Sequence, residues 1–225
     1  MSEVLVRGRE LARVFGTGEA AVTAVREASM EVSAADRVAI VGPSGSGKTT
    51  LLHLMAALDR PTAGHIEWPA LGPSEGLRPG LVAVAFQGPS LLPPLTVLEN
   101  VALPILLAGR DEREAMRIGA EMLERFGLSE IGYKLPEEIS GGQTQRAGIA
   151  RALAGSPRLV LADEPTGQQD SEGGRRALDA MLGCVAETGA ALVVATHDVY
   201  VAGRMAIRWS MSDGVLDAGV IARSG

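Results

Sequence analysis

The sequence predicts an α/β fold with a mainly parallel sheet, an N-terminal antiparallel β subdomain and an all-helical insertion. Short apolar runs bounded by polar residues or glycine have the form of buried parallel strands. These runs cover residues 38–41, 81–86, 159–162 and 191–196. Helical periodicity separates them, and residues 89–156 contain helical patterns without a strand candidate. This alternation predicts an α/β core that is interrupted by a helical segment.

The start of the chain is predicted to form the antiparallel part of the fold. The glycine-rich segment Gly16-Thr17-Gly18 is typical of a hairpin turn, because glycine adopts the positive φ angles that tight turns need. Short strand patterns flank it on both sides. They cover residues 4–6, 11–15, 21–25 and 28–32.

The helical patterns divide the chain into two predicted parts. Periodicity predicts helices near residues 111–126 and 141–154. We expect residues 1–88 and 157–225 to form the α/β core with its β subdomain. Residues 89–156 are expected to form the helical subdomain.

Composition excludes several classes of protein. The 225 residues are 46% hydrophobic and 21% charged, which is typical of a globular protein. The net charge of −6 argues against nucleic-acid binding as the main function, since such surfaces need excess Lys and Arg. Cys184 is the only cysteine, so an intrachain disulfide is excluded.

The start of the chain lacks a signal-peptide pattern. The apolar stretch 101–108 is interrupted by Pro104 and is far shorter than the roughly 20 residues that a membrane span requires. We expect another chain to provide any membrane crossing.

A glycine-rich loop joins the apolar run 38–41 to a helical pattern over residues 51–58. Its glycines let backbone N–H groups converge, and the following helix adds positive charge, so the loop can hold phosphate. Lys48 can reach the terminal phosphates, and the Thr49 hydroxyl can bind Mg²⁺. A tight turn alone would explain the glycines but not Lys48 and Thr49. The predicted nucleotide-binding residues are Gly42, Pro43, Ser44, Gly45, Ser46, Gly47, Lys48, Thr49 and Thr50.

Two adjacent carboxylates follow the apolar run 159–162. Ligands of parallel sheets bind at the carboxyl ends of the strands, which is where Asp163 and Glu164 lie. We assign Asp163 to the Mg²⁺ shell and Glu164 to accepting a proton from the water that attacks the γ-phosphate. The alternative is that Asp163-Glu164-Pro165 simply ends a strand and starts a turn.

A second potential anion site opens the helix near 141–154. The segment Ile139-Ser140-Gly141-Gly142-Gln143 places Ser140 as the N-cap, and its glycines leave backbone N–H groups accessible. By itself, this pattern could be only a capped helix start.

Together these motifs resemble those of the ATP-binding cassette (ABC) ATPases, whose signature motif is Leu-Ser-Gly-Gly-Gln. Gln145-Arg146 and Ala150-Arg151-Ala152-Leu153 match the residues that follow the signature in that family. The resemblance implies one cassette domain over residues 1–225, with ATP and Mg²⁺ as ligands. It also implies a head-to-tail dimer in which Ser140, Gly141, Gly142 and Gln143 of one copy meet the phosphate loop of the other.

Further positions match the family in order. Gln87 falls at the glutamine loop, which places an amide near Mg²⁺ and the attacking water. Asp170 belongs to the D-loop stretch 165–170, and His197 matches the switch histidine that holds the γ-phosphate. Phe15 falls where the family has an aromatic that stacks on adenine. Taken alone, Phe15 could be a strand core residue and His197 a structural histidine.

A finer resemblance is to the subgroup that serves lipoprotein release, macrolide efflux and control of cell-division hydrolases. It rests on Leu91-Leu92-Pro93 and on segments at 58–62, 95–101 and 165–167. In that subgroup the cassette drives a membrane protein with a large extracytoplasmic domain. Three departures from the family pattern are Ile139 for the signature leucine, Gln169 in the D-loop and a short connector at 64–80.

We therefore expect an ATP-hydrolysing subunit that is cytoplasmic and peripheral on the inner face of the membrane. Its residues near 87–107 are expected to dock a separately encoded permease. No nucleic-acid partner is expected. One alternative is a nucleotide-gated structural clamp with low turnover, against which Glu164 and His197 argue. Another is a phosphotransferase that shares only the phosphate loop, which would not need residues 140–143 together with His197.

Overall fold

The computed structural model describes residues 3–88, 90–167 and 171–219. The chain divides into two compact units, Met1–Leu77 with Ala191–Gly225 (unit 1) and Arg78–Ala190 (unit 2). Each unit is described separately below. The prediction of one cassette domain with subdomain borders at 89 and 156 stays a prediction.

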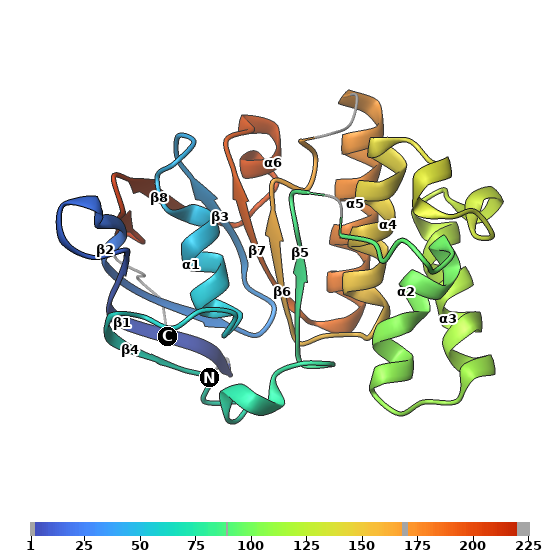
Figure 1. The fold of residues 1–225 in the computed structure, drawn as a ribbon, viewed down its shortest axis with the longest axis horizontal. Coiled ribbons are helices and arrows are strands. Elements are labelled where there is room, and N and C mark those ends of the chain that lie inside the picture. The colour runs from blue at the N-terminus through green and yellow to red at the C-terminus, as the bar shows by residue number, and fades with distance from the viewer. Residues whose placement is uncertain (1–2, 89, 168–170, 220–225) are drawn as a thin grey trace. The chain divides into compact units, whose positions relative to one another are not determined.

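Unit 1 is built on strands in the order β4-β1-β2-β9-β8-β3-β7, all of which except β9 are labelled in Figure 1. Its antiparallel part consists of β1 (Val4–Phe15), β2 (Val22–Ser33) and β4 (Ala63–Glu67). Its parallel part is β3 (Arg37–Val41) between β7 (Ala191–Thr196) and β8 (Ile207–Ser212), and β9 (Val215–Asp217) returns antiparallel to β8. The helices are α1 (Lys48–Met55) and α6 (Val199–Gly203), with short 3₁₀ turns η1 (Gly18–Ala20) and η2 (Ser74–Gly76).

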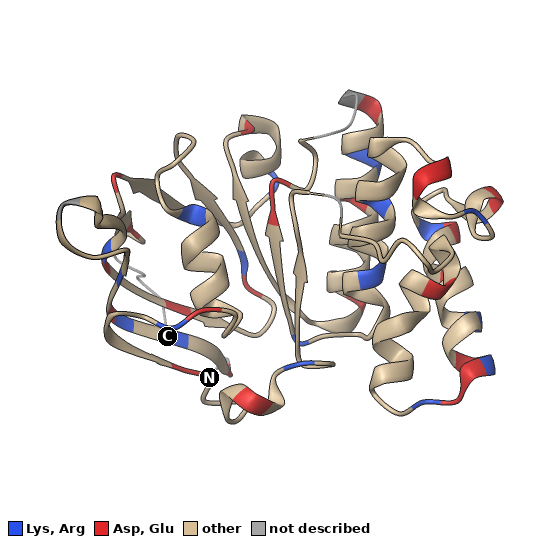
Figure 2. Cartoon of the chain, viewed as in Figure 1, with Lys and Arg blue, Asp and Glu red and all other residues tan. Residues whose placement is uncertain are grey.

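Unit 2 contains the parallel strands β5 (Val82–Ala85) and β6 (Leu159–Asp163). Its helices are α2 (Val97–Leu107), α3 (Glu112–Arg125), α4 (Gly141–Ala154) and α5 (Ser171–Thr188), with 3₁₀ turns η3 (Ser129–Ile131) and η4 (Pro136–Glu138). Figure 2 shows both acidic and basic residues on the helical part of this unit.

The predicted α/β fold is confirmed, and its buried strands lie where the apolar runs predict them. All six residues of β7 and all five of β6 are buried, which explains their continuous apolar character. Helices α3 and α4 occupy the two predicted helical segments. In the described part of 89–156 the secondary structure is entirely helical, as expected.

The prediction of four short N-terminal strands is wrong. The chain forms two strands of 12 residues each, β1 and β2, which pair as a hairpin around Gly16–Gly18. Register shifts interrupt their pairing, one of them between Gly8 and Leu11, where Glu10 has a φ of 49°. These bulges break the alternation of buried and exposed side chains, so the sequence pattern of each long strand is divided into two short runs.

An ion-pair ladder crosses the three antiparallel strands of unit 1. Arg7 of β1 lies opposite Glu31 of β2 and Glu67 of β4. Its Nε donates to Glu31 Oε2 and its Nη1 to Glu67 Oε1, each at 2.9 Å. The ladder raises the pKa of Arg7 through the hydrogen bonds to Glu31 and Glu67. Cross-strand pairs of this kind fix register and add modest stability.

Asn100 organises the loop that precedes α2. It is fully buried, and its side-chain amide donates to the carbonyls of Leu92, Leu95 and Thr96 at 3.0–3.1 Å. Its Oδ1 accepts from Leu92 N at 2.7 Å. Four bonds from one side chain thus hold the turn that leads into the helix.

Replacing Asn100 by Ala is expected to destabilise the protein by about 1–3 kcal/mol, because backbone groups of the turn lose their partners. Urea unfolding followed by circular dichroism measures this change. Leu107→Ala, on the same helix but 65% exposed, is the control and should change stability by less than about 0.5 kcal/mol. Equal losses in the two variants would contradict the role assigned to Asn100.

Candidate nucleotide site

In unit 1 the glycine-rich loop begins where β3 ends. Val41, the last residue of β3, pairs with Thr196, the last residue of β7, so the loop and His197 start at the same edge of the sheet. Asp198 N donates to Thr196 Oγ1 at 3.0 Å, which holds the backbone on either side of His197. The His197 side chain is exposed. Unit 1 therefore brings together the phosphate loop and the predicted switch histidine.

Different structural requirements explain why glycine stands at each of three positions in the loop. A Cβ on Gly42 would lie 2.0 Å from the Met211 carbonyl oxygen, and one on Gly47 would lie 2.1 Å from that of Ala24. These two glycines are thus required by packing within unit 1. Gly45, with a φ of 78° and open space around it, is favoured by its backbone conformation alone.

The polar groups of the loop fit a phosphate. Lys48 is 7% exposed, and its Nζ donates to the carbonyls of Gly42 and Pro43 at 2.8 Å, so the ammonium is held beneath the loop. Ser46 Oγ is buried and has no hydrogen-bond partner among the described residues. Pro43, Ser44 and Gly45 are exposed at the surface. An enclosed cation, an unused hydroxyl and the start of α1 are the groups that an oxyanion would use.

Phe15 ends β1 in unit 1, opposite Val22 of β2. Phe15 is 41% exposed, so the alternative that it is a strand core residue does not hold. Thr49 is exposed and Thr50 partly buried, both in the first turn of α1.

In unit 2 the predicted acids and the glutamine lie on neighbouring strands. Ala85 of β5 pairs with Ala162 of β6, so Gln87 and the pair Asp163 and Glu164 follow the ends of adjacent parallel strands. Gln87 is exposed, whereas the two acids are 6% and 8% exposed. Unit 2 therefore brings these three side chains to one edge.

Glu164 has an uncommon backbone conformation, with a φ of 45°. Positive φ is rare for a residue with a side chain and persists only where surrounding contacts hold it. The Glu164 carbonyl accepts from Gly167 N at 3.0 Å and from Gln145 Nε2 at 2.9 Å. Asp163-Glu164-Pro165 therefore does end a strand and start a turn, as the alternative interpretation predicts. Gln145 of α4 holds this turn through its bond to the Glu164 carbonyl.

Gln145 is a site residue whose role the sequence did not indicate. It is 6% exposed and joins the helix that begins at Ser140 to the strand end that carries Glu164. Arg151, six residues further along α4, donates to Ser90 O at 2.7 Å and to Ser90 Oγ at 2.9 Å. Burial lowers the pKa of Arg151. Helix α4 thus holds both the acidic turn and the segment after Gln87.

The predicted second anion site forms the N-terminus of α4. Ser140 Oγ accepts from Gln143 N at 3.3 Å, and Gln143 Oε1 accepts from Ser140 N at 2.9 Å. These two bonds form a capping box, so the capped helix start that was the alternative interpretation is present. Ser140 and Gly141 remain exposed. Asp170 and Gln169 lie outside the described residues.

Comparisons with known proteins agree with these features. The model of the family described as ABC transporter matches residues 25–167. The lipoprotein-releasing system ATP-binding protein LolD of Legionella pneumophila (strain Paris) is 38% identical over 91% of this chain and 93% of its own. An uncharacterized ABC transporter ATP-binding protein of Thermotoga maritima is 43% identical over 83% of this chain and 82% of its own.

A solved structure also matches closely. It is a dimeric ATP-binding cassette in a post-hydrolysis state bound to ADP and Pi, with a TM-score of 0.87 and 32% identity over 95% of this chain and 97% of that one. None of the helices in the described residues has the length and apolarity needed to span a bilayer. The chain belongs to the ABC transporter family and is an ATP-binding, ATP-hydrolysing subunit that powers a membrane transport complex.

Proposed function

We propose that two copies of this chain close on ATP, each offering its phosphate loop to one nucleotide and the N-terminus of its α4 to the other. Support comes from the exposure of both surfaces, at Pro43–Gly45 in unit 1 and at Ser140 and Gly141 in unit 2. The solved relative is a dimer with ADP and Pi. If ATP binds the closed form more tightly than the open one, this difference in affinity is the source of mechanical work.

Each site residue has a proposed role. Phe15 stacks on adenine, and the loop from Gly42 to Thr50 binds the phosphates, with Lys48 on the β- and γ-phosphates. His197 donates a hydrogen bond to the γ-phosphate and keeps the attacking water in line. Glu164 accepts the proton of that water. Across the dimer, Ser140, Gly141, Gly142 and Gln143 bind the γ-phosphate, and Asp170 lies at the contact between copies.

Thr49, Gln87 and Asp163 would hold Mg²⁺. Their hydroxyl, amide and carboxylate oxygens are the donors that this hard cation prefers. When bound, the ion neutralises charge that develops on the phosphates. The protein's own part is to supply these oxygens from α1, from the segment after β5 and from the end of β6.

The working complex would contain a separately encoded transmembrane permease that holds the chain on the cytoplasmic face. The similarity to LolD proteins makes a lipoprotein-releasing or mechanotransmission complex the preferred assignment. The permease would dock near residues 87–107. The alternative of a low-turnover structural clamp is not favoured, because the hydrolytic residues Glu164 and His197 are present.

The proposal is tested by phosphate release from the purified chain with and without the membrane protein encoded beside it, reconstituted in lipid vesicles. We expect the partner to bind the chain and to raise its ATPase rate. A partner that binds while turnover stays near zero would support the clamp instead.

A further inference from the structure

Phe15 has one ring face covered by an arginine from its own strand. The guanidinium carbon of Arg13 lies 4.3 Å from the centroid of the Phe15 ring. This is a cation–π contact, in which the planar cation stacks on the electron-rich face of the ring. Phe15 is still 41% exposed, so the contact with Arg13 leaves part of this residue at the surface.

The guanidinium is itself held in place by hydrogen bonds. Arg13 Nε donates to Asp59 Oδ2 at 2.7 Å, and Arg13 Nη1 donates to the Val14 carbonyl at 3.2 Å. Arg13 and Asp59 are about three-quarters buried, with side-chain exposures of 25% and 24%. An arginine fixed through Nε and Nη1 cannot swing away from the ring without losing both bonds.

Asp59 lies in the segment that follows α1 and is held in turn by this segment and by α1 itself. Its Oδ1 accepts from Arg60 N at 2.7 Å, and its own N–H donates to His53 O at 3.3 Å. Burial tends to raise the pKa of Asp59, but the hydrogen bonds from Arg13 and from Arg60 N outweigh it and leave this pKa below its ordinary value. The carboxylate is therefore charged at neutral pH, and its pairing with Arg13 persists.

The same segment is fastened to the end of β1 at a second point. Thr62 N donates to Ala12 O at 2.7 Å, and Val14 N donates to Thr62 Oγ1 at 3.0 Å. Residues 59–62 thus hold the strand on both sides of Arg13. The eight-residue helix α1 connects this segment to Lys48 of the phosphate loop.

We propose that Arg13, held by Asp59, is a positioning residue that fixes the Phe15 ring for the nucleotide base. The inference rests on the proposed contact between Phe15 and adenine. A ring already held by the guanidinium loses less rotational freedom when a base stacks on it, which strengthens binding. The bound base would form the outer layer of a stack of guanidinium, phenyl ring and adenine. Arg13 makes no contact with the phosphates in this arrangement.

The test measures binding of Mg-ATP and of Mg-tripolyphosphate by isothermal titration calorimetry. Arg13→Met removes the charge and keeps the aliphatic stem, and Asp59→Asn weakens the hold on Arg13 with little change of shape. Each is expected to weaken ATP binding about threefold to tenfold and to leave tripolyphosphate binding unchanged, because tripolyphosphate has no base. In ATPase assays, KM should rise while kcat stays constant.

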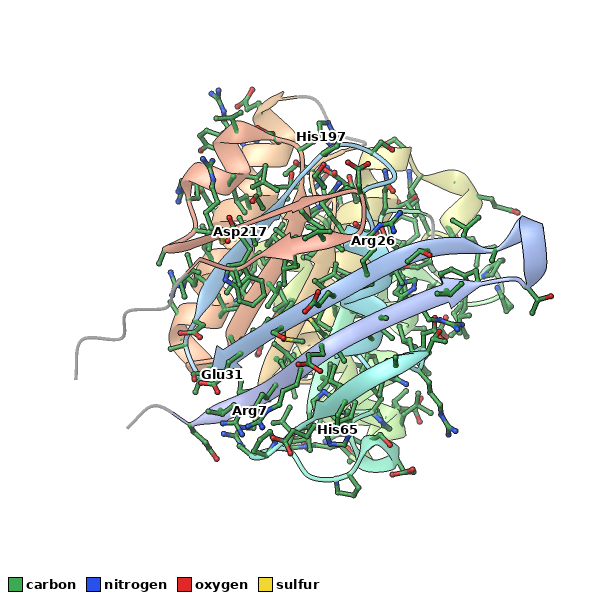
Figure 3. The ribbon with its side chains drawn as sticks, turned by 90° about the vertical axis from the view of Figure 1, so that its left-hand side faces the viewer. Arg7, Arg26, Glu31, His65, His197 and Asp217 are labelled. Carbon is green, nitrogen blue, oxygen red and sulfur yellow. The ribbon has the colours of Figure 1, made fainter. Side chains whose placement is uncertain are left out.

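A double-mutant cycle separates positioning of the ring from other effects. In a Phe15→Ala background, adding Arg13→Met should cause no further loss of ATP affinity. Arg7→Met is the matched control and should not alter ATP affinity. Arg7 is also a β1 arginine, but its partners are Glu31, which is labelled beside it in Figure 3, and Glu67. Thermal melting checks that each variant is folded. Arg13→Lys keeps the positive charge and should therefore bind ATP better than Arg13→Met.

The outcomes distinguish this inference from the proposal on which it rests. If Phe15→Ala leaves ATP affinity unchanged, the stacking role of Phe15 is wrong and the inference falls with it. If Phe15→Ala weakens ATP binding but Arg13→Met and Asp59→Asn do not, only the positioning role is wrong. Equal weakening of ATP and tripolyphosphate would also overturn it, because the effect would then lie in the phosphate loop.

Discussion

Replacing Glu164 by glutamine is expected to slow ATP hydrolysis about 10²–10⁴-fold while leaving ATP binding intact. The amide cannot accept a proton from the attacking water, but it has nearly the same size as the carboxylate. The backbone of the turn should persist, because its bonds from Gly167 N and Gln145 Nε2 go to the Glu164 carbonyl rather than to its side chain. Steady-state phosphate release and calorimetric ATP binding measure the two properties separately.

Glu172→Gln provides the control for this variant. Glu172 lies on α5 in the same unit, and its side chain is 76% exposed. The change should leave the ATPase rate within about twofold of the wild type, because it alters only a surface ion pair with Arg176. A Glu164→Gln protein that keeps more than a tenth of the wild-type rate would rule out Glu164 as the general base.

Replacing Lys48 by methionine is expected to weaken ATP binding at least about 30-fold, which corresponds to about 2 kcal/mol. Methionine keeps most of the aliphatic stem and removes the ammonium that would bind the β- and γ-phosphates. That ammonium donates to the Gly42 and Pro43 carbonyls, so in the proposed binding mode it would exchange these loop oxygens for phosphate oxygens. Tripolyphosphate binding should fall in parallel with ATP binding.

The chain offers a matched control, because Lys48 and Lys134 are its only lysines. Lys134 lies in unit 2 between η3 and η4. Lys134→Met makes the same chemical change away from the phosphate loop and should not alter ATP affinity. If the two variants bind ATP equally well, Lys48 is not a phosphate ligand.

How far the sequence predicts the fold depends on how each element is buried. Strands β6 and β7 are buried along their whole length, so their apolar runs are visible directly. Strand β8 alternates between exposed and buried positions and β9 has only three residues, so neither forms the continuous apolar run that predicts a buried strand. The sequence does not predict the bounds of helix α2, because Pro104 lies inside it, although Thr96 and Glu99 form a capping box at its start.

How much of the candidate site the sequence predicts depends on how far apart the interacting residues lie in the chain. The phosphate loop and the α4 cap depend on residues close together in the chain, so their patterns are local. The contacts of Gln145 with Glu164 and of Arg13 with Asp59 join residues 19 and 46 positions apart. Nothing local marks such partners. The family resemblance includes Gln145 in a motif, but it does not indicate that the Gln145 side chain is buried and donates to the Glu164 carbonyl.

Crosslinking between copies tests the composite site most directly. In a Cys184→Ser background, a Ser44→Cys protein is mixed with a Ser140→Cys protein and treated with a short bifunctional thiol reagent. With Mg-ATP, and with Glu164→Gln added to both proteins to prevent hydrolysis, we predict a crosslinked dimer that joins one protein of each kind. Crosslinking that fails, or that is equally strong without nucleotide, would contradict a site shared between two copies.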